Sequence, residues 1–280
     1  MKKKLPSSTL DRKRQEGESP SFSARLLIQA TLPHRKLSVS EHVRKNGDLT
    51  VRMIAPSSVG LPYGTYPRCM LHWITSQAVK TRSRVLFLGN LCCFMRDDLG
   101  LSPTGGKNGS ITRLREHMQR LFSCSMSWTN TEHGWHHRNV VPVEEAQLWW
   151  DPKDPAELVN WESSIVLSQA FYDEIVKHRV TLSARVLRAL AKDRLSLAMD
   201  VYSWLSYRMS RLKKPEQISW PSLALQFGAY YGRTRDFQAA FTEALAHVKT
   251  FYPWASVSPT SRGLRLYPSC PHVLPRPYRP

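Results

Sequence analysis

Residues 99–122, LGLSPTGGKNGSITRLREHMQRLF, contain a clear transition from a loop to a helix. Pro103 and the glycines after it favour a loop over 102–109, because proline and glycine interrupt regular structure. From Ser110 to Phe122, apolar residues recur at the three- and four-residue spacing of a helix with one buried face. The opposite face of this predicted helix carries Arg113, Arg115, Gln119 and Arg120.

The elements predicted around this helix follow a familiar order. Apolar spacing predicts a helix over 66–80, a strand over 85–88 and a helix over 91–99 ahead of it. Strands over 125–131 and 140–143 are predicted after it, joined by a histidine-rich turn. A helix, a short strand, two helices and a hairpin are the elements of a winged-helix domain, a variant of the helix-turn-helix.

The same order returns near the C-terminus. The pattern there predicts helices over 183–190 and 193–211, a strand over 218–220, helices over 222–227 and 234–251, and strands over 255–258 and 264–267. The two sets share no obvious sequence identity. We therefore predict an α+β fold with two tandem winged-helix domains.

The chain is expected to divide into four segments. Lys, Arg, Ser and Pro dominate the start of the chain, where the alternating Leu49, Val51 and Met53 suggest at most one strand. We expect a basic, mostly disordered N-terminal arm over 1–54, an N-terminal winged-helix domain over 55–180, a C-terminal winged-helix domain over 181–270 and a proline-rich tail over 271–280.

The charge of the chain points to a polyanionic partner. Forty Lys and Arg against 22 Asp and Glu give 280 residues a formal net charge of +18. Residues 181–280 carry 15 basic and 5 acidic side chains, whereas residues 55–180 carry 13 and 12. Residues 144–174 hold eight acidic side chains against one lysine, which favours a solvated or partner-facing surface. We expect the last hundred residues to make most phosphate contacts with nucleic acid.

The sequence favours a cytoplasmic protein without a membrane partner. No stretch approaches the length of an apolar membrane span, and the basic start is not followed by the apolar region of a signal peptide. Its five cysteines are odd in number and irregularly spaced, which favours reduced thiols over a disulfide framework.

The third helix of each predicted domain is the expected reader of base edges. Arginine bonds guanine and glutamine bonds adenine in the major groove, and wing residues contact the backbone. The candidates in the C-terminal domain are Arg233, Arg235, Gln238 and Thr242 on the helix, with Arg262 and Arg265 on the wing. Those in the N-terminal domain are Lys107, Ser110, Arg113, Arg115 and Gln119, with Arg138 on the wing. The alternative is a packed helix that merely exposes charged side chains.

No catalytic, cofactor or metal motif is convincing. The Gly105-Gly106-Lys107-Asn108 loop has neither the spacing nor the Ser/Thr of a phosphate-binding loop. His136 and His137 are adjacent, and neighbours on a strand face opposite ways, so they do not form a metal-binding pair. Cys92 and Cys93 stand alone on a predicted helix, without the spaced pairs of a zinc site. We expect no cofactor, no metal and no enzymatic activity.

Several blocks give the chain a family resemblance. LPYGTYPR over 61–68 and LGLSPTGGKNGSITRLRE over 99–116, with Leu88-Gly89 and Phe94-Met95-Arg96 between them, resemble the plasmid-encoded RepA family. The similarity covers about residues 55–270 and lapses in residues 1–50 and in the proline-rich end. It implies an initiator that binds repeated sites at a plasmid origin, helps open the duplex, recruits the host initiator and replicative helicase, and represses its own gene. It also implies a homodimer in equilibrium with a monomer, and strong contact with the repeat through the C-terminal domain.

Two other functions stay open. A winged-helix transcriptional repressor would share the fold and the charge, although simple repressors usually pair identical copies of one domain. A nicking replication enzyme would need the metal pair and the nucleophile that the sequence lacks. Direct repeats beside the gene favour the initiator, a single palindrome favours the repressor, and strand cleavage with a divalent metal favours the enzyme.

Overall fold

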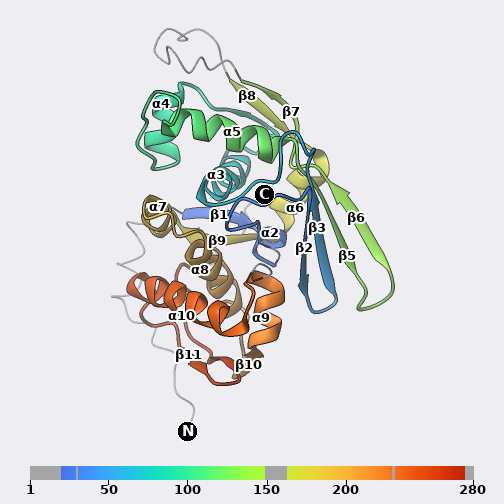
Figure 1. Ribbon diagram of the computed structural model, residues 1–280, viewed down its shortest axis with the longest axis vertical. Helices are drawn as coiled ribbons and strands as arrows, with labels where there is room; N and C mark the ends of the chain where they lie inside the picture. The colour runs from blue at the N-terminus through green and yellow to red at the C-terminus, as the bar shows by residue number, and fades with distance from the viewer. Residues whose placement is uncertain (1–19, 30, 149–162, 229–230, 275–280) are drawn as a thin grey trace.

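The computed structural model describes residues 20–29, 31–148, 163–228 and 231–274. These residues form a mixed α/β fold. Figure 1 shows α3 (Thr65–Thr81) and α8 (Ser196–Met209) near the middle of the molecule, with α5 (Ser110–Phe122) towards one end and α10 (Thr234–Phe251) towards the other. Residues 1–19, 149–162 and 275–280 of the expected arm, acidic segment and tail lie outside the described residues.

The expected disorder of the N-terminal arm is wrong for its described part. Strand β1 (Pro20–Ala24), helix α2 (Arg25–Gln29) and the hairpin of β2 (Glu41–Asn46) and β3 (Leu49–Ile54) are regular elements. Phe22, Leu26 and Ile28 are buried in the common core. Their few apolar side chains order this segment because helices from both halves of the chain cover them.

The helices predicted around residue 100 are confirmed. After α3 come β4 (Val85–Phe87), α4 (Leu91–Cys93) and its π-helical extension η1 (Phe94–Asp98), then α5. Helix α5 begins and ends at the predicted residues, and the apolar stripe of Ile111, Leu114, Met118 and Leu121 is buried. We call residues 65–167 the first unit.

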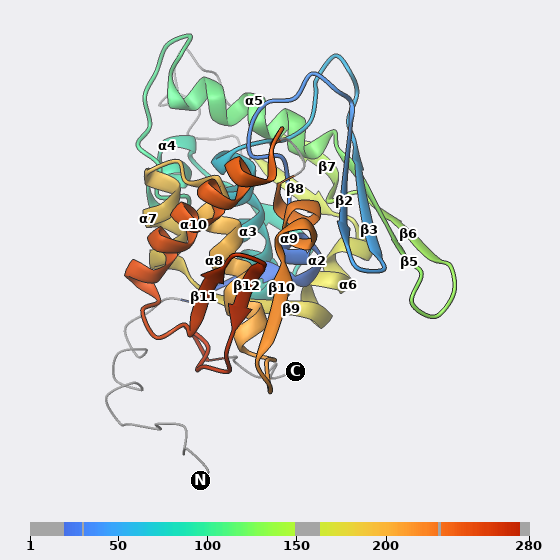
Figure 2. The same cartoon turned by 60° about the horizontal axis from the view of Figure 1, so that its bottom comes forward.

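The hairpin predicted after α5 pairs differently from the expectation. Strands β5 (Ser125–Asn130) and β6 (His136–Val140) extend the N-terminal hairpin into the sheet β2-β3-β5-β6. The predicted strand over 140–143 is wrong, because the chain leaves β6 there and begins β7 (Val143–Gln147) in another sheet. That sheet has the order β4-β8-β7, with β8 spanning Ser164–Leu167. Figure 2 shows the β5–β6 hairpin projecting from the body of the molecule.

The second unit, residues 184–266, follows the predicted order. Its helices are α7 (Ala184–Lys192), α8, α9 (Trp220–Phe227) and α10, and its strands are β10 (Glu216–Ser219), β11 (Val257–Thr260) and β12 (Gly263–Leu266). The sheet order β10-β12-β11 repeats that of β4-β8-β7: the first strand pairs with the third, and the third pairs with the second. Figure 2 shows these three strands side by side.

The two units are joined through the N-terminal segment and share one hydrophobic core. Helix α6 (Gln169–His178) leads into β9 (Arg179–Ser183), and β9 pairs antiparallel with β1 from Pro20↔Ser183 to Ala24↔Arg179. The expected boundary between residues 180 and 181 therefore falls inside a paired strand.

A buried ion pair connects the same three parts. Arg68 of α3 donates from Nε and Nη2 to the two carboxylate oxygens of Asp200 on α8, at 2.8 and 2.6 Å. Its remaining N–H groups reach the carbonyls of Leu32, Pro33 and Gly64. His34 Nε2 lies 2.8 Å from Asp200. Despite burial, which disfavours the charged form, Arg68 and His34 hold the pKa of Asp200 at about 2.

We predict that Arg68→Met destabilises the protein by roughly 3–5 kcal/mol, because it leaves the Asp200 carboxylate buried without its cation. Urea unfolding followed by far-UV circular dichroism measures this change. The exposed Arg96–Asp97 pair is the control, and Arg96→Met should leave the midpoint unchanged. Equal midpoints for the two variants would refute the assigned role of Arg68.

Three buried histidines are held neutral by their surroundings. Burial lowers the pKa of His42 to about 3, helped by the charge of Arg44. It lowers the pKa of His72 and of His117 to about 4 in each case. His117 packs between Tyr63 and Tyr66, with ring centroids 4.7 and 5.1 Å away. The unfolded chain therefore binds more protons than the folded chain between about pH 6.5 and pH 4.

Stability should consequently be full above pH 6.5 and fall as the pH drops towards 4. Each histidine contributes a slope of about 1.4 kcal/mol per pH unit in this window. Chemical denaturation at a series of pH values measures the loss. His117→Phe keeps a ring between the two tyrosines and should remove the share of the pH dependence that comes from this one histidine. A profile that is flat from pH 7 to pH 5 would contradict this account.

Candidate nucleic-acid interface

Helix α10 presents a polar stripe to solvent while its other face is locked into the second unit. Phe237 and Phe241 are buried against Trp220, with ring centroids 6.4 and 6.0 Å apart. Arg235 and Thr242 on the opposite face are exposed, and Gln238 between them is half-buried. Because side chains three and four positions apart share a helix face, these three residues form one stripe.

Arg233 precedes the first turn of α10 as its N-cap residue. Its guanidinium is exposed and lies 3.4 Å from the Asp236 carboxylate. An exposed pair of this kind holds its partners weakly, so the arginine is available to another anion. The structure thus brings the four predicted helix residues together on one exposed surface.

The β11–β12 hairpin of the second unit, predicted to be its wing, is short and fixed to the start of α9. Trp220 donates from Nε1 to the Thr260 carbonyl at 2.9 Å. A Cβ atom on Gly263 would lie 2.0 Å from the Ile218 carbonyl oxygen, so only glycine permits the close pairing of β10 and β12. Arg262 at the turn and Arg265 on β12 remain exposed.

In the first unit, Ser110 and Arg113 hold the preceding loop. Ser110 Oγ donates to the Ser102 carbonyl at 2.7 Å and accepts from Thr104 N at 2.8 Å. Arg113 donates to the Asn108 carbonyl at 2.6 Å. This loop leaves Lys107 exposed at its tip. Sequence reasoning gave Ser110 and Arg113 only a contact role and missed these bonds.

The other predicted residues of the first unit lie in an acidic or packed environment. Arg115 and Gln119 are exposed, but they line a hollow of about 360 Å³ together with Glu144 and Glu145 of β7. Arg138 lies on β6, with its guanidinium 5.7 Å from the Trp128 ring centroid. Arg138 therefore belongs to the four-stranded sheet β2-β3-β5-β6. It does not lie on the three-stranded sheet β4-β8-β7 that resembles the sheet of the second unit.

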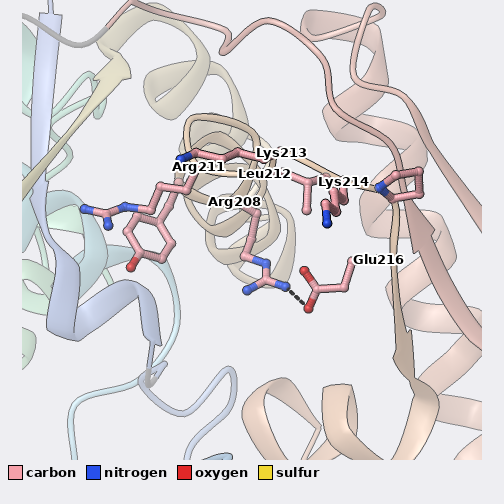
Figure 3. Close-up of a pocket in the computed structure, with 8 residues that line it drawn as sticks. Arg208, Arg211, Leu212, Lys213, Lys214 and Glu216 are labelled. Carbon is pink, nitrogen blue, oxygen red and sulfur yellow. Dashed lines mark ion pairs between the residues drawn. The ribbon is translucent and has the colours of Figure 1, made fainter.

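A further group of cations was not predicted as part of an interface. A hollow of about 450 Å³ at the end of α8 is lined by Arg208, Arg211, Lys213 and Lys214 (Figure 3). The sequence Lys213-Lys214-Pro215, which begins four residues after the end of α8, was the signal that could have identified it.

Comparison with known protein families identifies the family to which the chain belongs. Residues 61–221 match the model of the family described as plasmid encoded RepA protein. The chain belongs to this family. Membership supports a role in the initiation of plasmid replication. The RepA match ends at the start of α9, so α10 and the wing lie beyond it.

Solved structures extend the fold comparison beyond the RepA match. The chain is similar to a crystal structure of domains 2 and 3 of RctB, with a TM-score of 0.52 and 11% identity over 88% of this chain and 96% of that one. A second structure of these RctB domains matches with a TM-score of 0.49 and 12% identity, over 83% of this chain and 85% of that one. No curated protein matches significantly. At these identities, the similarity to RctB concerns the fold alone.

The described residues contain neither a candidate membrane span nor a candidate metal cluster. No described helix is long and apolar enough to cross a membrane. Within the same residues, no group of three or more His, Cys, Asp or Glu side chains is placed to hold a metal ion.

We predict that Arg235→Glu weakens binding to duplex DNA by roughly 10-fold or more at 0.1 M salt, because it replaces an exposed cation with an anion. Arg115→Glu should have a smaller effect, because Glu144 and Glu145 already make its surroundings unfavourable to phosphate. Fluorescence anisotropy with a labelled duplex measures both. Lys177→Glu on α6 is the charge-matched control. A larger loss for Arg115→Glu than for Arg235→Glu would reverse the assigned roles of the two units.

Proposed function

We propose that the protein initiates plasmid replication by binding repeated double-stranded sites at its origin. The observation that carries this proposal is the polar stripe on α10, in which Arg235 and Thr242 are exposed and Gln238 is half-buried, together with the exposed arginines of the wing. This stripe and the wing arginines lie within residues 181–280, the third of the chain that holds most of the excess positive charge. Membership of the RepA family supports the replication role.

In this proposal each unit is a winged-helix domain. The shared strand order of β4-β8-β7 and β10-β12-β11, each with helices between its first and second strands, supports this reading. Helix α10 enters the major groove, where Arg235 reads guanine and Gln238 reads adenine. Arg262 and Arg265 contact the backbone beside the groove. Helix α5 and the loop before it contact DNA more lightly, through Arg115 and Gln119 on the helix and Lys107 in the loop.

The remaining steps rest on the family resemblance. The bound protein helps to open the duplex, recruits the host initiator and replicative helicase, and represses its own gene. A homodimer in equilibrium with a monomer sets how much protein is active. The protein acts in the cytoplasm, where the plasmid resides, and does so as a binding protein without chemistry of its own.

A replicon assay tests the proposed function. A plasmid whose only replication functions are this gene and its flanking DNA should become established in a permissive host. Arg235→Glu should abolish establishment, whereas Lys177→Glu should not. Establishment with Arg235→Glu at the wild-type level would contradict the assignment of α10. A wild-type protein that represses its promoter but supports no replication would favour the repressor, and cleavage of one DNA strand in divalent metal would favour the nicking enzyme.

Gln238→Ala tests base reading separately from charge. It should lower affinity for the protected site by about 1–3 kcal/mol and leave non-specific binding unchanged, because it removes a base contact and no cation. Competition between specific and non-specific duplexes measures the ratio. Lys249→Ala, in the last turn of the same helix, is the matched control. An unchanged ratio for Gln238→Ala would remove Gln238 from the set of base-reading residues.

A further inference from the structure

The hollow at the end of α8 is a cationic surface that the recognition helix and the wing turn do not include. It has a volume of about 450 Å³ and is formed by the last turn of α8 and the loop to β10. Its acidic lining residue is Glu216, whose carboxylate forms an ion pair with Arg208. The Nη2 atom of Arg208 lies 2.5 Å from Oε1 of Glu216, and Figure 3 marks this pair with a dashed line. The charge that remains belongs to Arg211, Lys213 and Lys214.

These three cations are held where they face solvent. The Arg211 guanidinium lies over the Tyr207 ring, 4.9 Å from its centroid, which restricts the side chain without neutralising it. Lys213 and Lys214 are exposed, and neither forms an ion pair with any residue that the structure describes. Pro215 follows directly and limits the freedom of the loop that carries them. Among the described residues, the surface therefore keeps a net positive charge that no acidic side chain offsets.

The hollow continues towards the wing. A neighbouring hollow of about 280 Å³ shares Pro215 and Glu216 with it and is also lined by Gln217 and Arg265. Gln217 pairs with Arg265 across β10 and β12, and Ser219 pairs with Gly263 beside the wing turn. At about 3.3 Å per residue, Lys214, five residues before Ser219, lies within about 17 Å of that turn along the strand. Cations thus recur along one edge of the second unit, from Arg262 through Arg265 to Lys214.

We propose that this cationic edge binds successive backbone phosphates of nucleic acid and extends the DNA interface beyond the wing. The proposal rests on the proposed function, because it adds to the same complex. Phosphates follow one another at regular intervals along a DNA strand, so a line of cations can contact several of them in succession. Lysines supply point charges for these phosphates, and no base is read.

The lining favours nucleic acid over other anionic partners. A small-molecule pocket is predominantly apolar with a few placed polar groups, whereas this lining is mostly charged. An acidic protein segment would match the charge of the hollow alone. The cations continue to Arg265 in the neighbouring hollow and to the exposed Arg262 at the turn, and such a line of charge suits the repeated phosphates of a nucleic-acid backbone.

The test compares the double variant Lys213→Glu/Lys214→Glu with wild type in the full chain. Affinity is measured by anisotropy across a series of salt concentrations, on a 40-base-pair duplex of random sequence and on the DNA flanking the gene. The double variant should bind both duplexes more weakly by roughly 10-fold at 0.1 M salt. Its slope of log K against log salt should fall by about two, because each neutralised phosphate contributes about 0.9. Lys213→Arg/Lys214→Arg should restore both values.

Lys80→Glu/Lys177→Glu, on α3 and α6, changes the net charge equally and should leave the slope unchanged. Wild-type affinity and slope for the Lys213→Glu/Lys214→Glu variant would overturn the inference. So would a loss equal to that of the control pair, since it would reflect net charge alone. Failure of the proposed function differs from either result: wild type would then not prefer the flanking DNA over the random duplex.

Discussion

The ion pair between Arg68 and Asp200 determines how the parts of this protein are held together. The guanidinium has five N–H donors, and the structure satisfies them with the Asp200 carboxylate and three backbone carbonyls. A buried charge is tolerated only with such complete pairing. Since Arg68 belongs to α3, Asp200 to α8 and two of the carbonyls to residues 32–33, the pair aligns both units with the N-terminal segment.

This alignment gives the two units different surroundings. Helix α10 packs on α8 through its aromatic face and leaves Arg235, Gln238 and Thr242 to solvent. Helix α5 exposes Arg115 and Gln119 beside the glutamates of β7. The electrostatic potential is therefore favourable to DNA at the second unit and much less so at the first. The second unit thus offers a surface more favourable to phosphate than the first unit does. This difference suits the proposal that the protein binds its site mainly through the second unit.

The helices and the second unit could be predicted from the sequence because their signals are local. Helix α5 follows its loop with a regular apolar stripe, and α10 repeats the pattern with Phe237 and Phe241 facing inward. The N-terminal segment could not be predicted in this way. In β2 the inward-facing residues are His42 and Arg44, so the strand shows no apolar alternation, and the buried Arg44 donates a hydrogen bond to the Phe227 carbonyl of α9.

The pairing of strands was also beyond local reasoning. Strand β4 pairs with β8, about 80 residues further along the chain. Local patterns predicted only a hairpin of neighbouring strands after α5 and gave no indication of this distant pairing. At the candidate site, exposure of Arg235 and Thr242 follows from helical periodicity alone. The role of Arg113 in holding Asn108, and the cations gathered by the end of α8, depend on how loops fold back, which no spacing rule specifies.

Footprinting of the purified protein on the DNA flanking its own gene tests the central claim most directly. If the second unit reads repeated origin sites, several direct repeats should be protected at an even spacing close to a whole number of helical turns. Each repeat should show protection in one major groove and on the adjoining backbone. Protection of a single palindrome at the promoter, or of no defined sequence at all, would contradict the initiator account.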